Sequence, residues 1–209
     1  MNAPPQETNA SRRPLALILL SIAVTLAIAF RFIPTEYRLA NFAPVGAMFL
    51  FVGARVRPGI WYLLPFITML GTDLYFYEVQ DWNLPFLNYG CYMIYLLLGY
   101  QLLRKSESPV RIPVVALIGS VQFFLLSNFS VWVEHAIRPD QFGADSYPVY
   151  APNSAGLMHC FQMGWPFYRG TFLSDIVFTG MFFSAYAVLA RAYFQLERVP
   201  VHSISETNS

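Results

Sequence analysis

Two aspartates, Asp73 and Asp175, interrupt long apolar runs of this sequence. A charge near the centre of a bilayer costs about 2.5–3.5 kcal/mol on insertion scales, so such residues are usually retained for binding, ion transfer or bonds between helices. Asn128 adds a third strong polar group to another apolar run. Each of the three lies five or six residues from a charged residue that flanks its run, about 8–9 Å along a helix. We therefore expect the three side chains at a similar depth, near the outer face of a membrane.

Aromatic side chains share helix faces with these polar groups. Asn128 and Trp132 are four residues apart, as are Asp73 and Tyr77, which places each pair on one side of a helix. Aromatic rings beside carboxylates and amides are typical of pockets for flat, polar small molecules. The alternative, which the residues leave open, is that these polar groups only bond between helices. We predict substrate binding by eight residues: Asn41, Asp73, Asn128, Trp132, Trp165, Tyr168, Arg169 and Asp175.

The composition indicates which scaffold must position these residues. Of 209 residues, 56% are hydrophobic and only 12% are charged, with a mean hydropathy of +0.45. Soluble domains carry about 25% charged residues, and disordered chains combine low hydrophobicity with high charge. The net charge of +1 provides no basic surface for nucleic acid. The sequence therefore predicts an integral membrane protein, with the lipid bilayer as a partner and no nucleic acid.

The apolar runs predict an all-α protein with six transmembrane helices, because a spanning helix needs about 20 mostly apolar residues. The second run, Leu39–Ala54, has 16 residues and is short for a span. A long outer loop is expected over residues 134–169, whose aromatic second half should return to the membrane interface. Disordered tails are expected over residues 1–13 and 199–209, on either side of a membrane domain over residues 14–198. The six spans cover approximately residues 14–33, 39–54, 58–77, 82–103, 112–133 and 170–190.

The distribution of basic residues predicts the orientation. If the N-terminus is cytoplasmic and all six runs cross, nine of the thirteen Lys and Arg residues fall on the cytoplasmic side. Cytoplasmic loops are typically enriched in this way, and the asymmetry disappears if the second run does not cross. We therefore predict that both termini are cytoplasmic. The rival interpretation of Arg12-Arg13 and the following apolar run is a signal peptide, but this run is longer than usual and lacks a clear cleavage site.

The start of the second run offers a further binding feature. Pro44 suits the first turn of a helix, and Asn41 can cap the turn that precedes it. The helix N-terminus would then lie just inside the outer face, where free N–H groups attract anions. We expect this N-terminus to be open to an anionic part of a ligand, while Asp73 and Asp175 hold a cationic or hydrogen-bond-donating part.

Other kinds of chemistry find little support in the sequence. Cys91 and Cys160 are predicted to be unpaired thiols, since their spacing fits neither a disulfide framework nor a CxxC metal site. His135 and His159 could join Cys160 at a metal, but the spacing of zinc ligands is missing. The sequence contains no Walker motif and no nucleophile elbow. We therefore predict no metal, no cofactor and no enzymatic activity.

Several motifs resemble an uncharacterised family of bacterial membrane proteins that carries a domain-of-unknown-function label. The similarity covers approximately residues 30–185, and its motifs are Asn41 to Ala47, Asn128 to Trp132, Gly156 to Phe161 and Pro166 to Asp175. The architecture is in turn similar to the S component of energy-coupling-factor (ECF) vitamin transporters, which captures a substrate at the outer face.

This resemblance implies a six-helix protein of the bacterial inner membrane, with both termini inside and an S-component-like bundle. It implies capture of a vitamin-like or other small polar molecule, and partnership with an ECF T component and ATPase subunits. It also implies that Ala23 and Ala27 dock a partner, because they match the alanine-x-x-x-alanine pattern on the first helix of S components.

Three functions remain as alternatives at this point. The first is an S-component-like subunit for the uptake of a small molecule. The second is a structural or assembly subunit of a membrane complex, whose polar residues form interhelical bonds only. The third is a membrane enzyme that acts on a lipid at the outer face. The sequence favours the first, because three runs carry a strong polar group at a similar depth.

Overall fold

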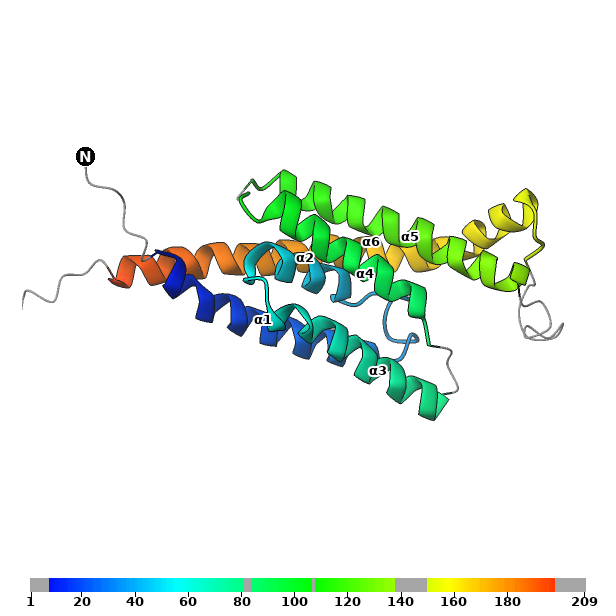
Figure 1. The fold of residues 1–209 in the computed structure, drawn as a ribbon, viewed down its shortest axis with the longest axis horizontal. Coiled ribbons are helices and arrows are strands. Elements are labelled where there is room, and N and C mark those ends of the chain that lie inside the picture. Colours follow the sequence, from blue (N-terminus) through cyan, green and yellow to red (C-terminus); the bar gives the residue numbers. More distant parts are fainter. Residues whose placement is uncertain (1–7, 81–83, 107, 138–149, 198–209) are drawn as a thin grey trace, which may run out of the picture.

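The computed structural model describes residues 8–80, 84–106, 108–137 and 150–197. Within these residues all regular structure is helical, which confirms the predicted all-α class (Figure 1). The six α-helices are α1 (Thr8–Phe32), α2 (Val45–Arg55), α3 (Leu64–Gln80), α4 (Phe86–Leu98), α5 (Arg111–Ile137) and α6 (Ser154–Glu197). A 3-10 turn, η1 (Ile60–Tyr62), precedes α3, and a π-helical turn, η2 (Gly99–Leu103), continues α4.

Three of the described helices are long and apolar enough to cross a membrane, which indicates a membrane protein. They are α5 and the segments Pro14–Phe32 of α1 and Ser154–Ala192 of α6. Helix α2 is apolar but has only 11 residues. At 1.5 Å per residue it is about 16 Å long, roughly half the thickness of the hydrocarbon core of a bilayer.

Two predicted boundaries are wrong. The expected outer loop over residues 134–169 is helical over most of its described part, because α5 continues to Ile137 and α6 begins at Ser154 and passes through Pro166. Aromatic residues in this region pack on α5, so the backbone is held as a helix rather than as a loop. The N-terminal tail predicted over residues 1–13 is also helical from Thr8 onward, while residues 1–7 and the tail over 199–209 lie outside the described residues.

Consecutive helices alternate in direction, and α1 begins at the end of the bundle where α6 ends (Figure 1). The opposite end, which we call the distal end, holds the last turn of α1 with the segment that follows it to Ala43, the end of α3, the start of α4 and the neighbouring ends of α5 and α6. Helix α6 has 44 residues. It would therefore measure about 66 Å, more than twice the roughly 30 Å of a hydrocarbon core.

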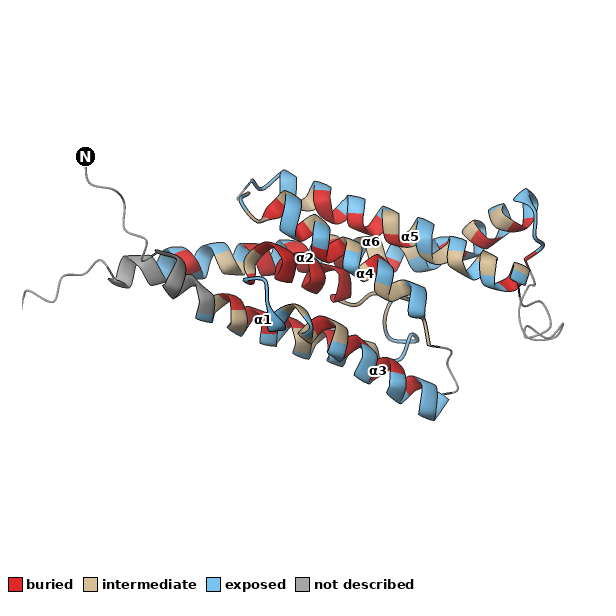
Figure 2. Ribbon diagram, in the orientation of Figure 1, coloured by how far each residue is buried: buried red, intermediate tan, exposed pale blue. Residues whose placement is uncertain are grey.

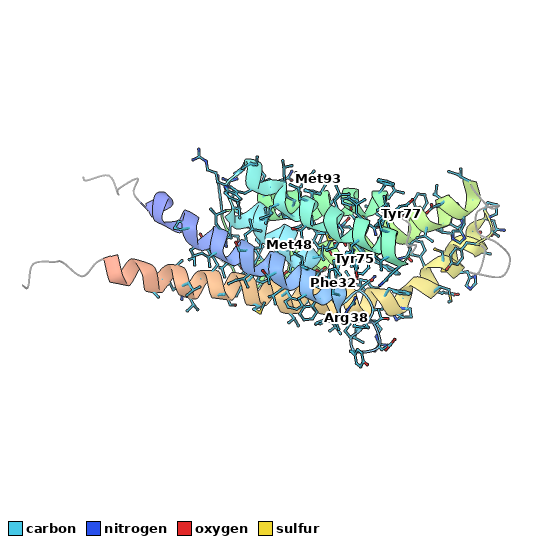
Figure 3. The ribbon with its side chains drawn as sticks, turned by 90° about the horizontal axis from the view of Figure 1, so that it is seen from below. Phe32, Arg38, Met48, Tyr75, Tyr77 and Met93 are labelled. Atoms are coloured by element: carbon cyan, nitrogen blue, oxygen red, sulfur yellow. The ribbon has the colours of Figure 1, made fainter. Side chains whose placement is uncertain are left out.

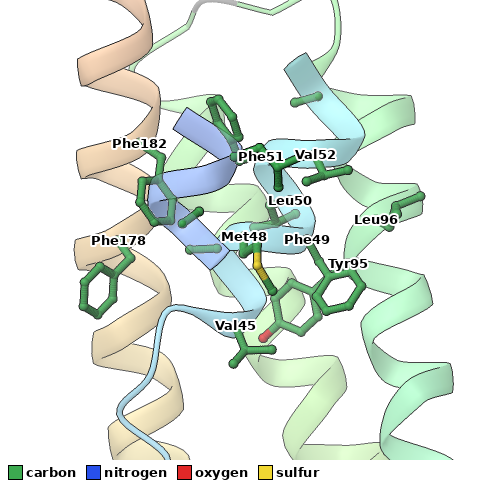
Figure 4. Close-up of a cluster of buried hydrophobic side chains, with 14 of the residues drawn as sticks. Val45, Met48, Phe49, Leu50, Phe51, Val52, Tyr95, Leu96, Phe178 and Phe182 are labelled. Carbon is green, nitrogen blue, oxygen red and sulfur yellow. The ribbon is translucent and has the colours of Figure 1, made fainter. Parts of the chain in front are cut away.

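Helix α2 lies inside the bundle (Figure 2). All ten residues from Val45 to Ala54 are buried, as expected for a helix that is apolar on every side. Figure 4 shows its side chains among those of α4 and α6. Gly53 and Gly99 permit the contact with α4, because a Cβ atom at either would collide with a carbonyl of the other helix. The backbones of α2 and α4 therefore touch directly.

The C-terminal end of α2 is pinned by Arg55. Its guanidinium donates to the carbonyl oxygens of Leu103 and Arg104, both at 3.3 Å, and of Ser106 at 2.6 Å. It also lies 5.2 Å from the ring centroid of Phe183 on α6. Leu103 ends the π-helical turn and its carbonyl also accepts the backbone N–H of Ser106 at 3.1 Å, so the cation adds a charged donor to carbonyls at and just after this helix end.

The alanines predicted to dock a partner face inward instead. Ala23 and Ala27 are both 0% exposed and belong to the hydrophobic core. Helix α1 packs against α2, α3 and α6, and small residues allow such close approach. The docking prediction for these two residues is therefore wrong, because their helix face is covered by the chain itself.

Candidate functional site

A buried ion pair joins α1 to α3 at the distal end. The guanidinium of Arg31, in the last turn of α1, pairs with the carboxylate of Asp73, which is 5% exposed. Tyr89 of α4 donates to the second carboxylate oxygen at 2.6 Å. Arg31 also lies 5.5 Å from the ring centroid of Phe76, while its buried Nε has no hydrogen-bond partner. Three helices thus meet at one carboxylate.

A second buried carboxylate belongs to Asp175 of α6, which is 1% exposed. It accepts hydrogen bonds from the hydroxyl of Tyr95 on α4 and from the backbone N–H of Ala47 in the first turn of α2. No cation pairs with Asp175 among the described residues. Gly46 makes room for the carboxylate, because a Cβ atom there would collide with it and would come within 2.8 Å of the Tyr95 ring.

This arrangement corrects the expectation that the N-terminus of α2 is open to a ligand. Pro44 precedes the helix without a side-chain capping bond, and the Asp175 carboxylate supplies the missing acceptor. The negative charge also suits the positive end of the helix dipole. Asn41 does not cap α2 and takes a left-handed backbone conformation with φ of 58°, which asparagine tolerates well.

One face of α4 connects the two carboxylates. Tyr89, Tyr92 and Tyr95 are spaced three residues apart, and the first and last bind Asp73 and Asp175 respectively. The ring of Tyr92 stacks on Phe49 of α2 with centroids 5.1 Å apart and an interplanar angle of 6°. The helix therefore presents three tyrosines between α2, α3 and α6.

The other predicted residues lie along the contact between α5 and α6. Asn128 donates its amide to the carbonyl of Phe124 at 2.8 Å, and Gly164 on α6 leaves space for its side-chain oxygen. Trp132 donates its indole N–H to the carbonyl of Ala151 at 2.9 Å. The Asn128 bond lies within α5, whereas the Trp132 bond joins α5 to the segment before α6.

Aromatic rings extend the same contact. The ring of Tyr168 is 4.9 Å from that of Phe124, and Trp165 lies 5.4 Å from Tyr168 while 56% exposed. An exposed tryptophan beside a tyrosine is typical of the membrane interface. Arg169 follows them and is exposed.

The structure therefore divides the predicted site into separate groups. Asp73 does not meet Asp175 or Arg169 but pairs with Arg31, and Asp175 lies at the start of α2. Asn128, with the aromatic residues named above, belongs to the α5–α6 contact. Tyr77 is 47% exposed and does not accompany the buried Asp73. The expectation of a single outer cluster is wrong because shared depth does not bring residues to one side of a bundle.

Sequence reasoning missed Arg31, Tyr89 and Tyr95, the three side chains that bind the buried carboxylates. Two signals were available. Arg31 is the first charged residue after the first apolar run. A cation at the end of a helix can pair with a buried carboxylate near the same end of a neighbouring helix. The i, i+3 spacing of the α4 tyrosines places them on one helix face.

Both cysteines are free thiols, as predicted, and both are buried. Cys160 lies on α6 rather than in a loop, and its thiol donates to the carbonyl of Asn128 at 3.3 Å. The backbone N–H of Tyr150 points to Nδ1 of His135 at 3.5 Å, and the two rings are 4.9 Å apart. Within the described ranges, no group of three or more His, Cys, Asp or Glu side chains is arranged to hold a metal ion.

Comparison with known proteins identifies a family but no function. No curated protein and no solved structure matches the chain. The model of a family of unknown function, DUF6580, matches residues 10–199. This match includes every described helix apart from the first two residues of α1. The chain therefore belongs to DUF6580, a family of unknown function.

Proposed function

We propose that this chain captures a small polar molecule at the outer face of a membrane, as an S-component-like subunit for uptake. The proposal has three parts, which are the topology, the binding end of the bundle and the partners. It assigns binding rather than catalysis to the chain, and it requires no cofactor.

The proposed topology has six crossings, the second made by the short helix α2, with both termini in the cytoplasm of a bacterial cell. The alternation of the helices in Figure 1 and the common end of α1 and α6 support an even number of crossings. The basic residues support the orientation, since nine of thirteen fall on the cytoplasmic side in this arrangement. The distal end then faces outward from the inner membrane.

The observation that carries the binding proposal is the group formed by Arg31, Asp73 and Tyr89. Three helices each contribute a charged or hydroxyl side chain at the distal end. A buried ion pair gains little stability over well-packed apolar residues, because desolvation offsets its attraction. A group of this kind at the outer end is better suited to binding than to stability alone.

An S-component-like role implies an ECF T component and ATPase subunits as partners, because this chain has no Walker motif of its own. Ala23 and Ala27 are buried within this chain, so the proposed docking surface lies on other residues. Exposed apolar side chains are frequent on α3 and α5 and would contact lipid or a partner.

Mass spectrometry of the full-length protein, purified in nanodiscs, tests the proposal. We expect a metabolite to be retained at about one molecule per chain from the wild type, and to be lost from Asp73→Asn. The matched control is Glu78→Gln, which removes an exposed carboxylate from the same helix. If the wild type reproducibly retains no metabolite, the uptake function is wrong.

One observation favours a structural or assembly subunit as the second candidate. Asp73 and Asp175 both have hydrogen-bond partners inside the chain, as polar groups that only join helices would have. This function predicts a tightly bound protein partner and no retained metabolite in the same purification. A membrane enzyme that acts on a lipid is a third candidate. Turnover of a lipid by the purified protein would identify this activity.

A further inference from the structure

The end of the bundle opposite the distal end, which we call the proximal end, is basic. It holds the end of α2, the turn η2 and the start of α5. From Pro44 to Thr72 and from Asn83 to Val133 the sequence has a single acidic residue, Glu107, which lies outside the described residues. The same two stretches contain five basic residues, which are Arg55, Arg57, Arg104, Lys105 and Arg111.

The neighbouring helices do not supply the missing carboxylates. Helix α1 contains no acidic residue, and α6 contains none between Asp175 and Glu197. The acidic residues of α3 and α5 all lie toward the distal end, and they are Asp73, Glu78 and Glu134. The proximal end therefore carries an excess of positive charge on the sides of all the helices that meet there.

Hydrogen bonds from Arg55 bring two of these basic segments together. Its Nη1 donates to the carbonyl of Arg104 at 3.3 Å, and its Nη2 donates to the carbonyl of Ser106 at 2.6 Å. One turn before the end of α2, a Cβ atom at Gly53 would come within 2.8 Å of the backbone nitrogen of Tyr100. The backbone that carries Arg104 is thus fixed against the end of α2.

The side chain of Arg104 lies over an aromatic ring at the surface. Its Cζ is 4.9 Å from the ring centroid of Tyr100. The residue is half-buried, and its Nη1 is buried without a hydrogen-bond partner. Arg104 forms no ion pair with any described residue. Partial burial strengthens the attraction of such a cation for an anion, because the dielectric constant around it is lower than in water.

An apolar strip leads along α4 and η2 to this guanidinium. Met93, Leu97 and Tyr100 are 44%, 43% and 42% exposed, and their spacing of four and three residues places them on one helix face. Figure 3 shows Met93 at the outer side of the bundle. Arg104 follows Tyr100 by four residues and continues this face. An apolar strip that ends at a cation matches a ligand with a hydrocarbon chain and an anionic headgroup.

We propose that Arg104 binds the phosphate of an anionic phospholipid, whose acyl chain lies along Met93, Leu97 and Tyr100. This site is separate from the proposed uptake function and does not depend on the molecule captured at the distal end. A planar guanidinium binds a phosphate through two parallel N–H bonds. Basic groups between membrane helices are typical sites for anionic headgroups.

Two further cations assist Arg104. Lys105 is exposed next to it and adds charge that attracts the headgroup. Arg55 is a positioning residue, because its bonds to backbone carbonyls hold the segment that carries Arg104. Orientation in the membrane requires only that basic residues lie in a cytoplasmic connection. It does not require the ring under Arg104 or the apolar strip beside it, which a bound lipid uses.

Native mass spectrometry of the full-length protein tests this site, after release from nanodiscs of phosphatidylcholine with about one fifth phosphatidylglycerol. We expect the wild type to retain about one phosphatidylglycerol per chain, in preference to phosphatidylcholine. Arg104→Gln should retain at least about tenfold less, because charge-assisted bonds to the phosphate are lost. Arg104→Lys should retain an intermediate amount. The matched control, Arg191→Gln, removes an exposed arginine of α6 near the same end and should retain the wild-type amount.

A second variant protects the test against misfolding, because Arg104 also packs on Tyr100. Lys105→Gln removes an exposed charge, and its unfolding temperature in detergent should match that of the wild type. It should lower the retained phosphatidylglycerol by about fivefold, as expected for one cation near a headgroup.

Several results would overturn the lipid site. Equal retention of the two lipids by the wild type is one, and undiminished retention by both Arg104→Gln and Lys105→Gln is another. An equal loss in Arg191→Gln would show a general attraction to the basic end rather than a site. Release of the lipid by inorganic phosphate at constant ionic strength would identify a free anion as the ligand. An acidic protein that co-purifies with the wild type but not with Arg104→Gln would identify a protein partner instead.

Discussion

Tyr95 of α4 donates a hydrogen bond to the carboxylate of Asp175 on α6, and this carboxylate also accepts the N–H of Ala47 at the start of α2. One acidic side chain therefore joins three helices and caps the short helix in the core. Pro44 offers no capping side chain, so the acceptor comes from a residue more than a hundred positions away in the sequence. The position of α2 depends on this contact at one end and on Arg55 at the other.

Coupling between Tyr95 and Asp175 can be measured with a double-mutant cycle. Tyr95→Phe should lower the free energy of unfolding by about 1–3 kcal/mol, because it leaves a buried acceptor short of a donor. Together with Asp175→Asn, the loss should differ from the sum of the single losses by at least about 0.5 kcal/mol. Unfolding by SDS from mixed micelles, followed by circular dichroism, gives the values. Tyr37→Phe, at a side chain that is 79% exposed, is the control. Strict additivity would contradict the bond.

Space at Gly46 is required for the same contact. Gly46→Ala should lower the free energy of unfolding by about 1–3 kcal/mol, because the new methyl group collides with Asp175 and Tyr95. Gly180→Ala is the matched control, since a Cβ atom there meets nothing within 4 Å. This second change should be neutral or stabilising by up to about 1 kcal/mol, as in other helices. Equal effects of the two substitutions would show that α2 is not packed as described.

Breaking the ion pair between Arg31 and Asp73 should be more costly than replacing it. Arg31→Gln or Asp73→Asn alone should cost about 3–5 kcal/mol, because the remaining charge is buried without its partner. The double substitution Arg31→Met with Asp73→Leu should cost less than either single change. Arg57→Gln serves as the surface control in the same unfolding assay. The pair would not be buried in the membrane-embedded protein if both single changes had no effect.

Lysine should not be able to replace Arg55 without a loss of stability. Arg55→Gln should cost about 1.5–3 kcal/mol, because carbonyls at the end of η2 lose a charged donor. Arg55→Lys should recover little of this, since an ammonium cannot reproduce the planar fork or its stacking on Phe183. Lys105→Gln, at an exposed neighbour of these carbonyls, should change the unfolding free energy by less than about 0.5 kcal/mol. Full recovery by lysine would mean that only the charge matters.

The six-crossing topology predicts opposite sides for successive connections. A reporter inserted between α3 and α4 should be active only outside the cytoplasm, and one inserted between α4 and α5 only inside it. A reporter fused behind the last residue should also read cytoplasmic. The inner connection carries Arg104, Lys105 and Arg111, which favour retention inside. Two successive connections on the same side would contradict the crossing of α4.

The burial of the two aspartates was predictable, whereas the neighbours of their side chains were not. Asp73 and Asp175 were recognised as buried from the apolar residues around them, and both are buried. Their partners were missed, because Arg31 is 42 positions from Asp73 and Tyr95 is 80 positions from Asp175. Sequence periodicity describes the faces of one helix, but it does not say which other helix covers a face.

The predicted helix boundaries were wrong where tertiary contacts outweighed the local preferences of the sequence. The segment before Gly170 contains Pro166 and many aromatic residues, which suggested a loop at the membrane surface. Its rings pack on α5, and this contact supports a continuous helix from Ser154. Likewise Ala23 and Ala27 match a docking pattern, but small residues serve equally well to admit a neighbouring helix of the same chain.

Hydropathy and charge along the chain were sufficient for the all-α class, the membrane setting, the short second helix and the two buried carboxylates. These properties depend on how many apolar residues follow one another, which is local information. The position of α2 inside the bundle, the capping of its N-terminus by Asp175 and the pairing of Arg31 with Asp73 required the folded structure. The physical reason is that packing between distant segments determines which faces meet, and a buried polar group binds the partner that this packing brings within reach.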